Sequence, residues 1–102
     1  MLELYEAIGR ASARMREAAE AGDWDGLVAA ESECAALVAR LRARAGEVSL
    51  APPEIERRNA ILRQVLADDA AIRERVEPRL AELDRLVRGA TARQRFEKRY
   101  RE

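Results

Sequence analysis

The stretch AAEAGDWDGLVAAE, residues 18–31, decides the fold of this chain. Gly22 is suited to the left-handed conformation that commonly ends a helix. Asp23 follows it directly and is a favourable N-cap for a second helix. A connection of only two residues between two helices forces the chain to turn back on itself, so the sequence predicts an antiparallel helical hairpin.

The segments on either side of this turn have helical periodicity. Residues 2–21 place apolar or small side chains three and four positions apart: Leu4, Tyr5, Ile8, Ala11, Ser12, Met15, Ala18 and Ala19. Residues 24–45 form a second stripe, which is made of Trp24, Leu27, Val28, Cys34, Leu37, Val38 and Leu41. Gly46 is expected to end the second helix.

A third and longer helix is predicted over residues 53–88, after Pro52 and Pro53. Its stripe stays in phase across Pro78, which favours a kinked but continuous helix. At 1.5 Å per residue it would span ~54 Å, against ~30–33 Å for each helix of the hairpin. Its far end must therefore overhang the hairpin and expose apolar side chains, namely Leu80, Leu83, Leu86 and Val87.

Gly89 and Ala90 suggest a further break, and Thr91 with Gln94 forms a capping-box pattern. We therefore expect a short fourth helix over residues 91–101, whose apolar edge is Phe96 and Tyr100. Such a short helix is marginal in water unless it docks on the overhanging stripe. The expected architecture is a single all-α domain over residues 1–102: an antiparallel hairpin, a long kinked third helix and a short C-terminal helix.

Composition argues against catalysis and membrane insertion. The chain has no His, and Cys34 is its only cysteine, so a zinc site or a cofactor is not expected. Asp68 and Asp69 are adjacent, so their side chains point in different directions on a helix, and we interpret both as solvated charges. Asp69 and Glu31 nevertheless each fall on an apolar stripe. The absence of a long apolar run and of a signal peptide predicts a cytoplasmic protein.

The third helix supplies the candidate partner-binding residues, because an amphipathic partner helix binds through anchors three and four residues apart. These candidates are Leu62, Val65, Leu66, Asp69, Ile72 and Val76. Each of them could equally be a core residue. Two other readings stay open: a scaffold that self-associates, for instance as a homodimer, through the overhang, and a nucleic-acid or transcription-regulator binding module. The basic tail favours nucleic acid, whereas a net charge of zero argues against it.

The turn at residues 21–31 resembles the signature of the flagellar export chaperone FliT family, a Gly-(Asp/Glu)-Trp-Asp-x-Leu turn followed by a Glu. Similar matches occur at residues 61–72 and 79–83, at Gly89 and at the Tyr100-Arg101 ending. The all-helical chorismate mutases, by contrast, are not matched, since their acid pair and lysine partner are missing.

The resemblance implies a cytoplasmic helical bundle that binds the C-terminal region of the filament-cap protein FliD before type III export. It also implies contacts with the export apparatus and, for some members, inhibition of the regulator FlhDC. In enteric members the last helix covers the partner groove, a role that would fall here on Phe96 and Tyr100. This chain departs from the family pattern by the interruption at Pro78 and by a short covering helix.

Overall fold

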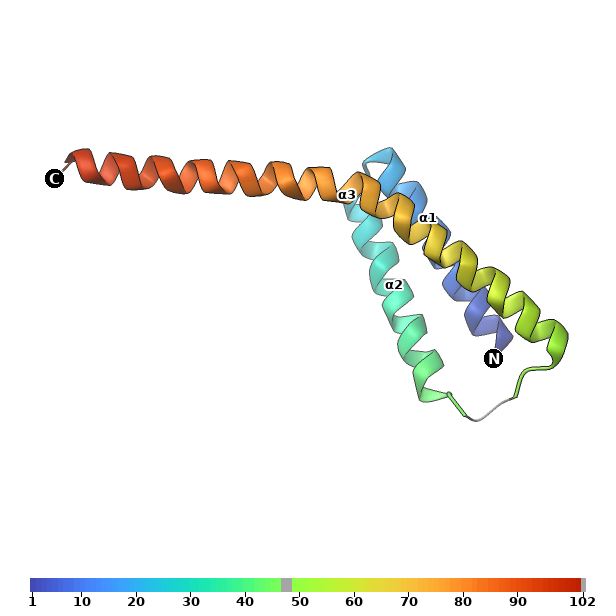
Figure 1. Ribbon diagram of the computed structural model, residues 1–102. Helices are drawn as coiled ribbons and strands as arrows, with labels where there is room; N and C mark the ends of the chain where they lie inside the picture. Colours follow the sequence, from blue (N-terminus) through green and yellow to red (C-terminus); the bar gives the residue numbers. More distant parts are fainter. Residues whose placement is uncertain (47–48, 102) are drawn as a thin grey trace.

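The computed structural model describes the backbone of residues 1–46 and 49–101, and the side chains of residues 1–46 and 49–89. The described backbone contains three helices: α1 at Leu2–Ala21, α2 at Trp24–Ala43 and α3 at Pro52–Arg101 (Figure 1). The described part of the chain contains no strand. The all-α class and the antiparallel hairpin are therefore confirmed.

The turn between α1 and α2 has the predicted chemistry. Gly22 has a φ of 71°, and the amides of Gly22 and Asp23 donate to the carbonyls of Ala19 (3.2 Å) and Ala18 (2.8 Å). The Asp23 carboxylate accepts a hydrogen bond from the Gly26 amide at 3.0 Å. A Cβ atom on residue 26 would lie only 2.7 Å from Cγ of Asp23, so glycine at this position gives the capping carboxylate its space.

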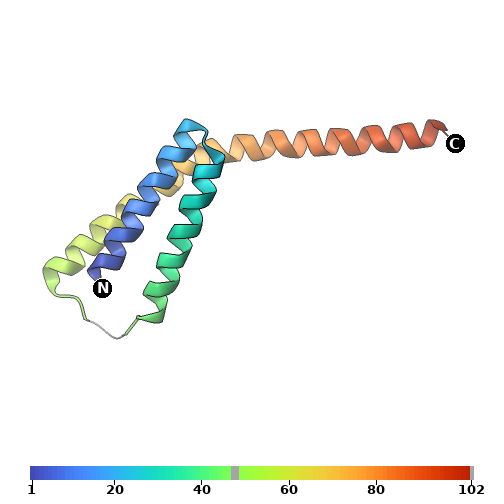
Figure 2. The same ribbon diagram turned by 180° about the vertical axis from the view of Figure 1, so that it is seen from behind.

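Helix α1 is the central element, because it packs against both α2 and α3. Among the described residues, no Cα atom of α2 comes within 8 Å of one in α3. Figure 2 shows α1 between the two other helices, which diverge from each other. Within residues 1–46 and 49–89 the buried apolar side chains are few: Leu4, Ile8, Ala11, Ala19, Ala30 and Ile61. Gly9 permits the close approach of α1 and α3, since a Cβ there would lie 3.2 Å from Ile61 Cγ2.

Asp68 is buried in the interface between α1 and α3, with only 4% of its surface exposed. Its carboxylate accepts hydrogen bonds from Ser12 Oγ (2.9 Å), Gln64 Nε2 (3.3 Å) and Arg16 Nη1 (3.4 Å). Hydrogen bonds to Glu20 and then to Asp68 raise the pKa of Arg16, which keeps this guanidinium charged. The interpretation of Asp68 as a solvated charge was therefore wrong, because Asp68 shares the inward face with Ile61.

Helix α3 is continuous through Pro78 and changes direction about halfway along its length, where yellow turns to orange in Figure 1. This kink agrees with the loss of one backbone hydrogen bond and with the steric demand of the proline ring. The second half of α3 projects away from the hairpin, so the molecule measures 72 × 26 × 18 Å. The side chains of Leu80, Leu83, Leu86 and Val87 are 45–64% exposed, which confirms the predicted overhang.

Three boundaries differ from the prediction. Helix α2 ends at Ala43 rather than at residue 45, α3 begins at Pro52, and residues 91–101 continue α3 instead of forming a separate helix. A single glycine costs a helix only about 1 kcal/mol relative to alanine, and the residues around Gly89 are mostly good helix formers, so no break is required there. The side chains of Phe96 and Tyr100 lie outside the described ones.

Candidate functional site

The divergence of α2 and α3 leaves an open groove with α1 as its floor. We call this surface the α2–α3 groove. Near the turn between α1 and α2, which we call the hairpin end, it contains a hollow of about 370 Å³. The hollow is lined by Met15 from α1, by Leu27 and Glu31 from α2, and by Asp69, Ile72, Arg73, Val76, Glu77 and Leu80 from α3. All three helices therefore contribute to it.

A second hollow of about 250 Å³ lies at the opposite end of the same groove, near the connection between α2 and α3. We call this the connection end. Polar and apolar atoms contribute about equally to its walls. The lining residues come from all three helices and the connection: Met1, Tyr5, Leu41, Ala45, Gly46, Leu50, Ile55 and Arg58. The two hollows therefore lie at the two ends of the α2–α3 groove, and we call the surface that runs from one to the other the trough.

The six predicted binding residues lie along one side of α3, between or within these hollows. Asp69, Ile72 and Val76 line the hollow at the hairpin end. Val65 is half-buried, whereas Leu62 and Leu66 are 41% and 70% exposed. Positions 55, 58, 62, 65, 69, 72 and 76 follow one another at helical spacing, which places Leu62 and Val65 on the row that joins the two hollows. Leu66 is adjacent to this row, at its rim.

Sequence reasoning missed the residues that α1 and α2 contribute to the groove. Met15 and Leu27 appeared only as members of core stripes, and the connection-end residues Ile55 and Arg58 were not proposed. The available signal was the stripe on α2, which is wider than its contact with α1 requires. Ala30, on the side toward α1, is its only buried residue, while Leu27, Cys34, Leu37, Val38 and Leu41 are half-buried.

Charged groups surround the hairpin end of the groove. Asp69 Oδ2 and Arg73 Nε form an ion pair at 3.1 Å. Glu31 and Glu77 form no ion pair within the described part of the chain, so the lining carries a net negative charge. The Arg79 guanidinium carbon lies 5.5 Å from the centroid of the Trp24 ring, a cation–π contact between α3 and the start of α2.

Cys34 lies on the groove side of α2 and is half-buried. Burial, and then the negative charges of Glu33 and Glu31, raise the pKa of its thiol. A thiol whose pKa is raised carries less thiolate at neutral pH, so Cys34 is a poor nucleophile. In this environment Cys34 acts as a small, largely apolar side chain that is not fully buried.

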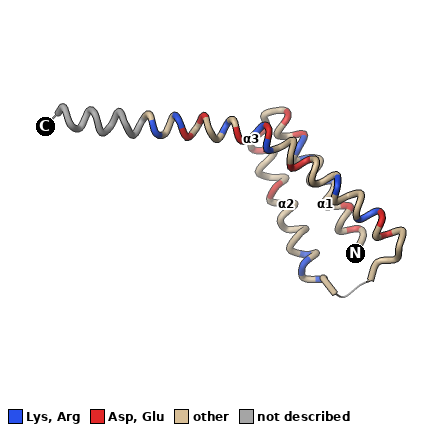
Figure 3. Tube along the Cα trace, in the orientation of Figure 1, with Lys and Arg blue, Asp and Glu red and all other residues tan. Residues whose placement is uncertain are grey.

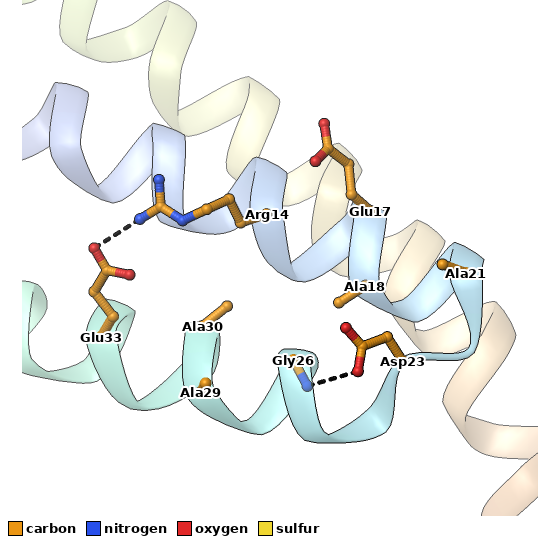
Figure 4. Close-up of a pocket in the computed structure, with 9 residues that line it drawn as sticks. All are labelled: Arg14, Glu17, Ala18, Ala21, Asp23, Gly26, Ala29, Ala30 and Glu33. Carbon is orange, nitrogen blue, oxygen red and sulfur yellow. Dashed lines mark hydrogen bonds and ion pairs between the residues drawn. The ribbon is translucent and has the colours of Figure 1, made fainter.

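A hollow of about 440 Å³ lies on another face, between α1 and α2 (Figure 4). Its bottom is formed by alanines and Gly26, and the Arg14–Glu33 ion pair (2.7 Å) spans one end of it. Asp23 faces this hollow while its carboxylate caps α2. The hollow therefore follows from small side chains between two helices. Three of its four charged residues, Arg14, Glu33 and Asp23, have partners within the chain.

The described residues contain neither a metal-binding cluster nor a membrane-spanning helix. No group of three or more His, Cys, Asp or Glu side chains there could hold a metal ion. No helix in the same part of the chain is long and apolar enough to cross a membrane. Together with the hollows between α2 and α3, these features define a small all-α bundle of three helices.

The chain belongs to the FliT family, because the family model described as "Flagellar protein FliT" matches residues 2–102. It is also similar to the crystal structure of flagellar protein FliT from Bordetella bronchiseptica, with 34% sequence identity and a TM-score of 0.73. The match covers 83% of this chain and 96% of the Bordetella chain. Among curated proteins, no match is found. The family assigns a flagellar chaperone role, which is not enzymatic.

Proposed function

We propose that this protein is a cytoplasmic type III export chaperone that holds the C-terminal region of the filament-cap protein FliD in the α2–α3 groove. The observation that carries the proposal is the trough itself, which is floored by α1 and open between α2 and α3. A partner helix in this trough would cover side chains of α3 that the monomer leaves exposed or half-buried. Removing such apolar surface from water favours binding by roughly 25 cal/mol per Å².

The proposed contact residues on α3 remain Leu62, Val65, Leu66, Asp69, Ile72 and Val76. The proposed cover is the segment that carries Phe96 and Tyr100. Because α3 is continuous to Arg101 and projects away from the groove (Figure 1), covering requires the helix to open near Gly89. Glycine is the residue whose helical state is least favourable apart from proline, so a break is least costly there.

Calorimetric titration with the C-terminal region of FliD from the same bacterium tests the proposal. Val65→Asp and Ile72→Asp each place a charge on the groove row and should weaken binding at least tenfold, while circular dichroism shows a folded bundle. Leu86→Asp is the matched control, since it makes the same change on the overhang. If the segment fails to bind the wild-type protein, the proposed partner is wrong.

The overhang favours a second candidate function, a self-associating scaffold. Leu80, Leu83, Leu86 and Val87 form an exposed apolar strip on the projecting half of α3. Multi-angle light scattering separates the two functions. A tight dimer that Leu86→Asp dissociates, and that binds no FliD segment, would favour the scaffold. A monomer that binds the segment would favour the chaperone.

A further inference from the structure

The α2–α3 groove differs in charge between its two ends. At the hairpin end the lining includes Glu31 and Glu77 from opposite walls, and its other charged residues, Asp69 and Arg73, form an ion pair at 3.1 Å. Beside this lining, Arg79 adds one positive charge over the Trp24 ring. At the connection end, the part of the lining that the structure describes contains Arg58 and no acidic side chain. Outside this lining the charges are mixed: α2 ends with Arg40 and Arg42, whereas α1 and α3 begin with Glu3 and Glu54 in their first turns. Figure 3 shows this mixture as blue at the end of α2 and red near the starts of α1 and α3.

The apolar part of the groove sets the kind of occupant. The row on α3 has helical spacing, and α1 and α2 each span 20 residues along the trough. A straight helix of about 20 residues, roughly 30 Å long, therefore matches the length of the groove. Its apolar anchors would lie three and four positions apart, as in other helix-in-groove complexes.

The charges set the direction of that helix. A helix carries about half a positive charge at its N-terminus and half a negative charge at its C-terminus. The N-terminus is stabilised near Glu31 and Glu77, and the C-terminus is stabilised near Arg58. Basic side chains in the first turns and acidic ones in the last turns would add to this complementarity.

We infer that the groove selects an amphipathic helix that is basic in its first turns and acidic in its last turns, and that this helix binds antiparallel to α3. This inference deepens the proposed function and rests on it, since it assigns polarity to the same groove. It identifies the ligand by chemistry alone: a helix with an apolar stripe, whose N-terminus lies at the hairpin end. Glu31 and Glu77 are the carboxylates that recognise its basic end.

Two synthetic 21-residue peptides of identical composition test the inference on the full-length protein. Both carry leucines at the same helical positions. One has lysines flanking the stripe in the first two turns and glutamates in the last two, and the other has these charges exchanged. The wild-type protein should prefer the basic-first peptide by about tenfold at low salt. The exchanged peptide must either lose its ion pairs or bind in the opposite direction, with its helix dipole unfavourably placed at both ends.

The matched variants separate groove recognition from peptide helicity. Glu31→Gln/Glu77→Gln should reduce the preference between the two peptides by about fivefold or more. Glu56→Gln/Glu74→Gln removes the same total charge from exposed positions outside both hollows and should leave the preference unchanged. Comparing preferences between variants cancels the difference in helicity of the free peptides. An equal loss in both double variants would overturn the assignment to Glu31 and Glu77.

Trp24, the only tryptophan of the chain, reports the direction of binding from the hairpin end. A nitroxide on the N-terminus of the basic-first peptide should quench Trp24 fluorescence, and the same label on its C-terminus should quench it much less. The reverse result would overturn the inferred direction. If the peptides show the predicted preference but the FliD segment does not bind, the inferred direction of binding is supported and the proposed partner is wrong. If FliD binds while both peptides bind equally, the inferred direction of binding is wrong and the proposed partner is supported.

Discussion

Replacing Asp68 by alanine should destabilise the bundle although the residue is charged and lies in a mostly polar helix. The change removes a buried carboxylate that accepts hydrogen bonds from Ser12, Gln64 and Arg16. Gln64 keeps its bond to the Gly9 carbonyl (3.1 Å), and Arg16 keeps Glu20. The Ser12 hydroxyl, in a residue only 4% exposed, is left without a described partner, which costs about 1–3 kcal/mol.

We therefore expect Asp68→Ala to lower the free energy of unfolding by about 2 kcal/mol, out of a total on the order of 5–10 kcal/mol. Urea unfolding followed by circular dichroism at 222 nm measures this change. Adding Ser12→Ala removes the orphaned hydroxyl, so the double variant should be more stable than the sum of the single effects predicts, by about 0.5 kcal/mol or more. Asp69→Ala, on the exposed side, is the control and should change stability by less than about 0.5 kcal/mol. Equal effects of Asp68→Ala and Asp69→Ala, or strict additivity in the cycle, would refute the reasoning.

Three other changes test the local structure. Asp23→Ala removes the acceptor for the Gly26 amide and should cost about 1 kcal/mol in urea unfolding; a loss no greater than that of Asp25→Ala would contradict the cap. Pro78→Ala restores a backbone donor and should straighten α3, so the radius of gyration measured by X-ray scattering should increase. An unchanged radius of gyration would mean that the bend has another cause. Because the pKa of Cys34 is raised, its alkylation by iodoacetamide should be slower than that of free cysteine at pH 8 and should accelerate at higher pH. Glu31→Gln should move the pH profile of the alkylation rate toward lower pH. A pH profile identical to that of free cysteine would contradict the burial of the thiol.

Sequence reasoning worked where a short segment carries the whole physical cause. Gly22 and Asp23 act through their own φ angle and carboxylate, so the hairpin could be predicted from residues 18–31. The same holds for the kink, since the defect lies in Pro78 itself. It failed at Asp68, because assigning residue 68 or residue 69 to the buried face depends on the exact rotation of α3 against α1. One residue corresponds to about 100° of helical rotation.

The candidate groove shows the same division. Helical spacing on α3 identified Asp69, Ile72 and Val76, which line the hollow at the hairpin end. The opposite wall, with Leu27 and Glu31, could not be assigned, because an apolar stripe on α2 is compatible with burial against either neighbour. The actual arrangement depends on α1 packing against both α2 and α3 while these two diverge.

The order of the helices, the sharp turn and the excess length of α3 were therefore determined by the sequence, because each depends on local backbone preferences and on residue number. The tertiary structure decided which faces of the helices stay open, that Asp68 is enclosed, and that the hollows at the two ends of the hairpin differ in the charges that line them. These features depend on how three helices are rotated and inclined against one another, and many residues share in that geometry.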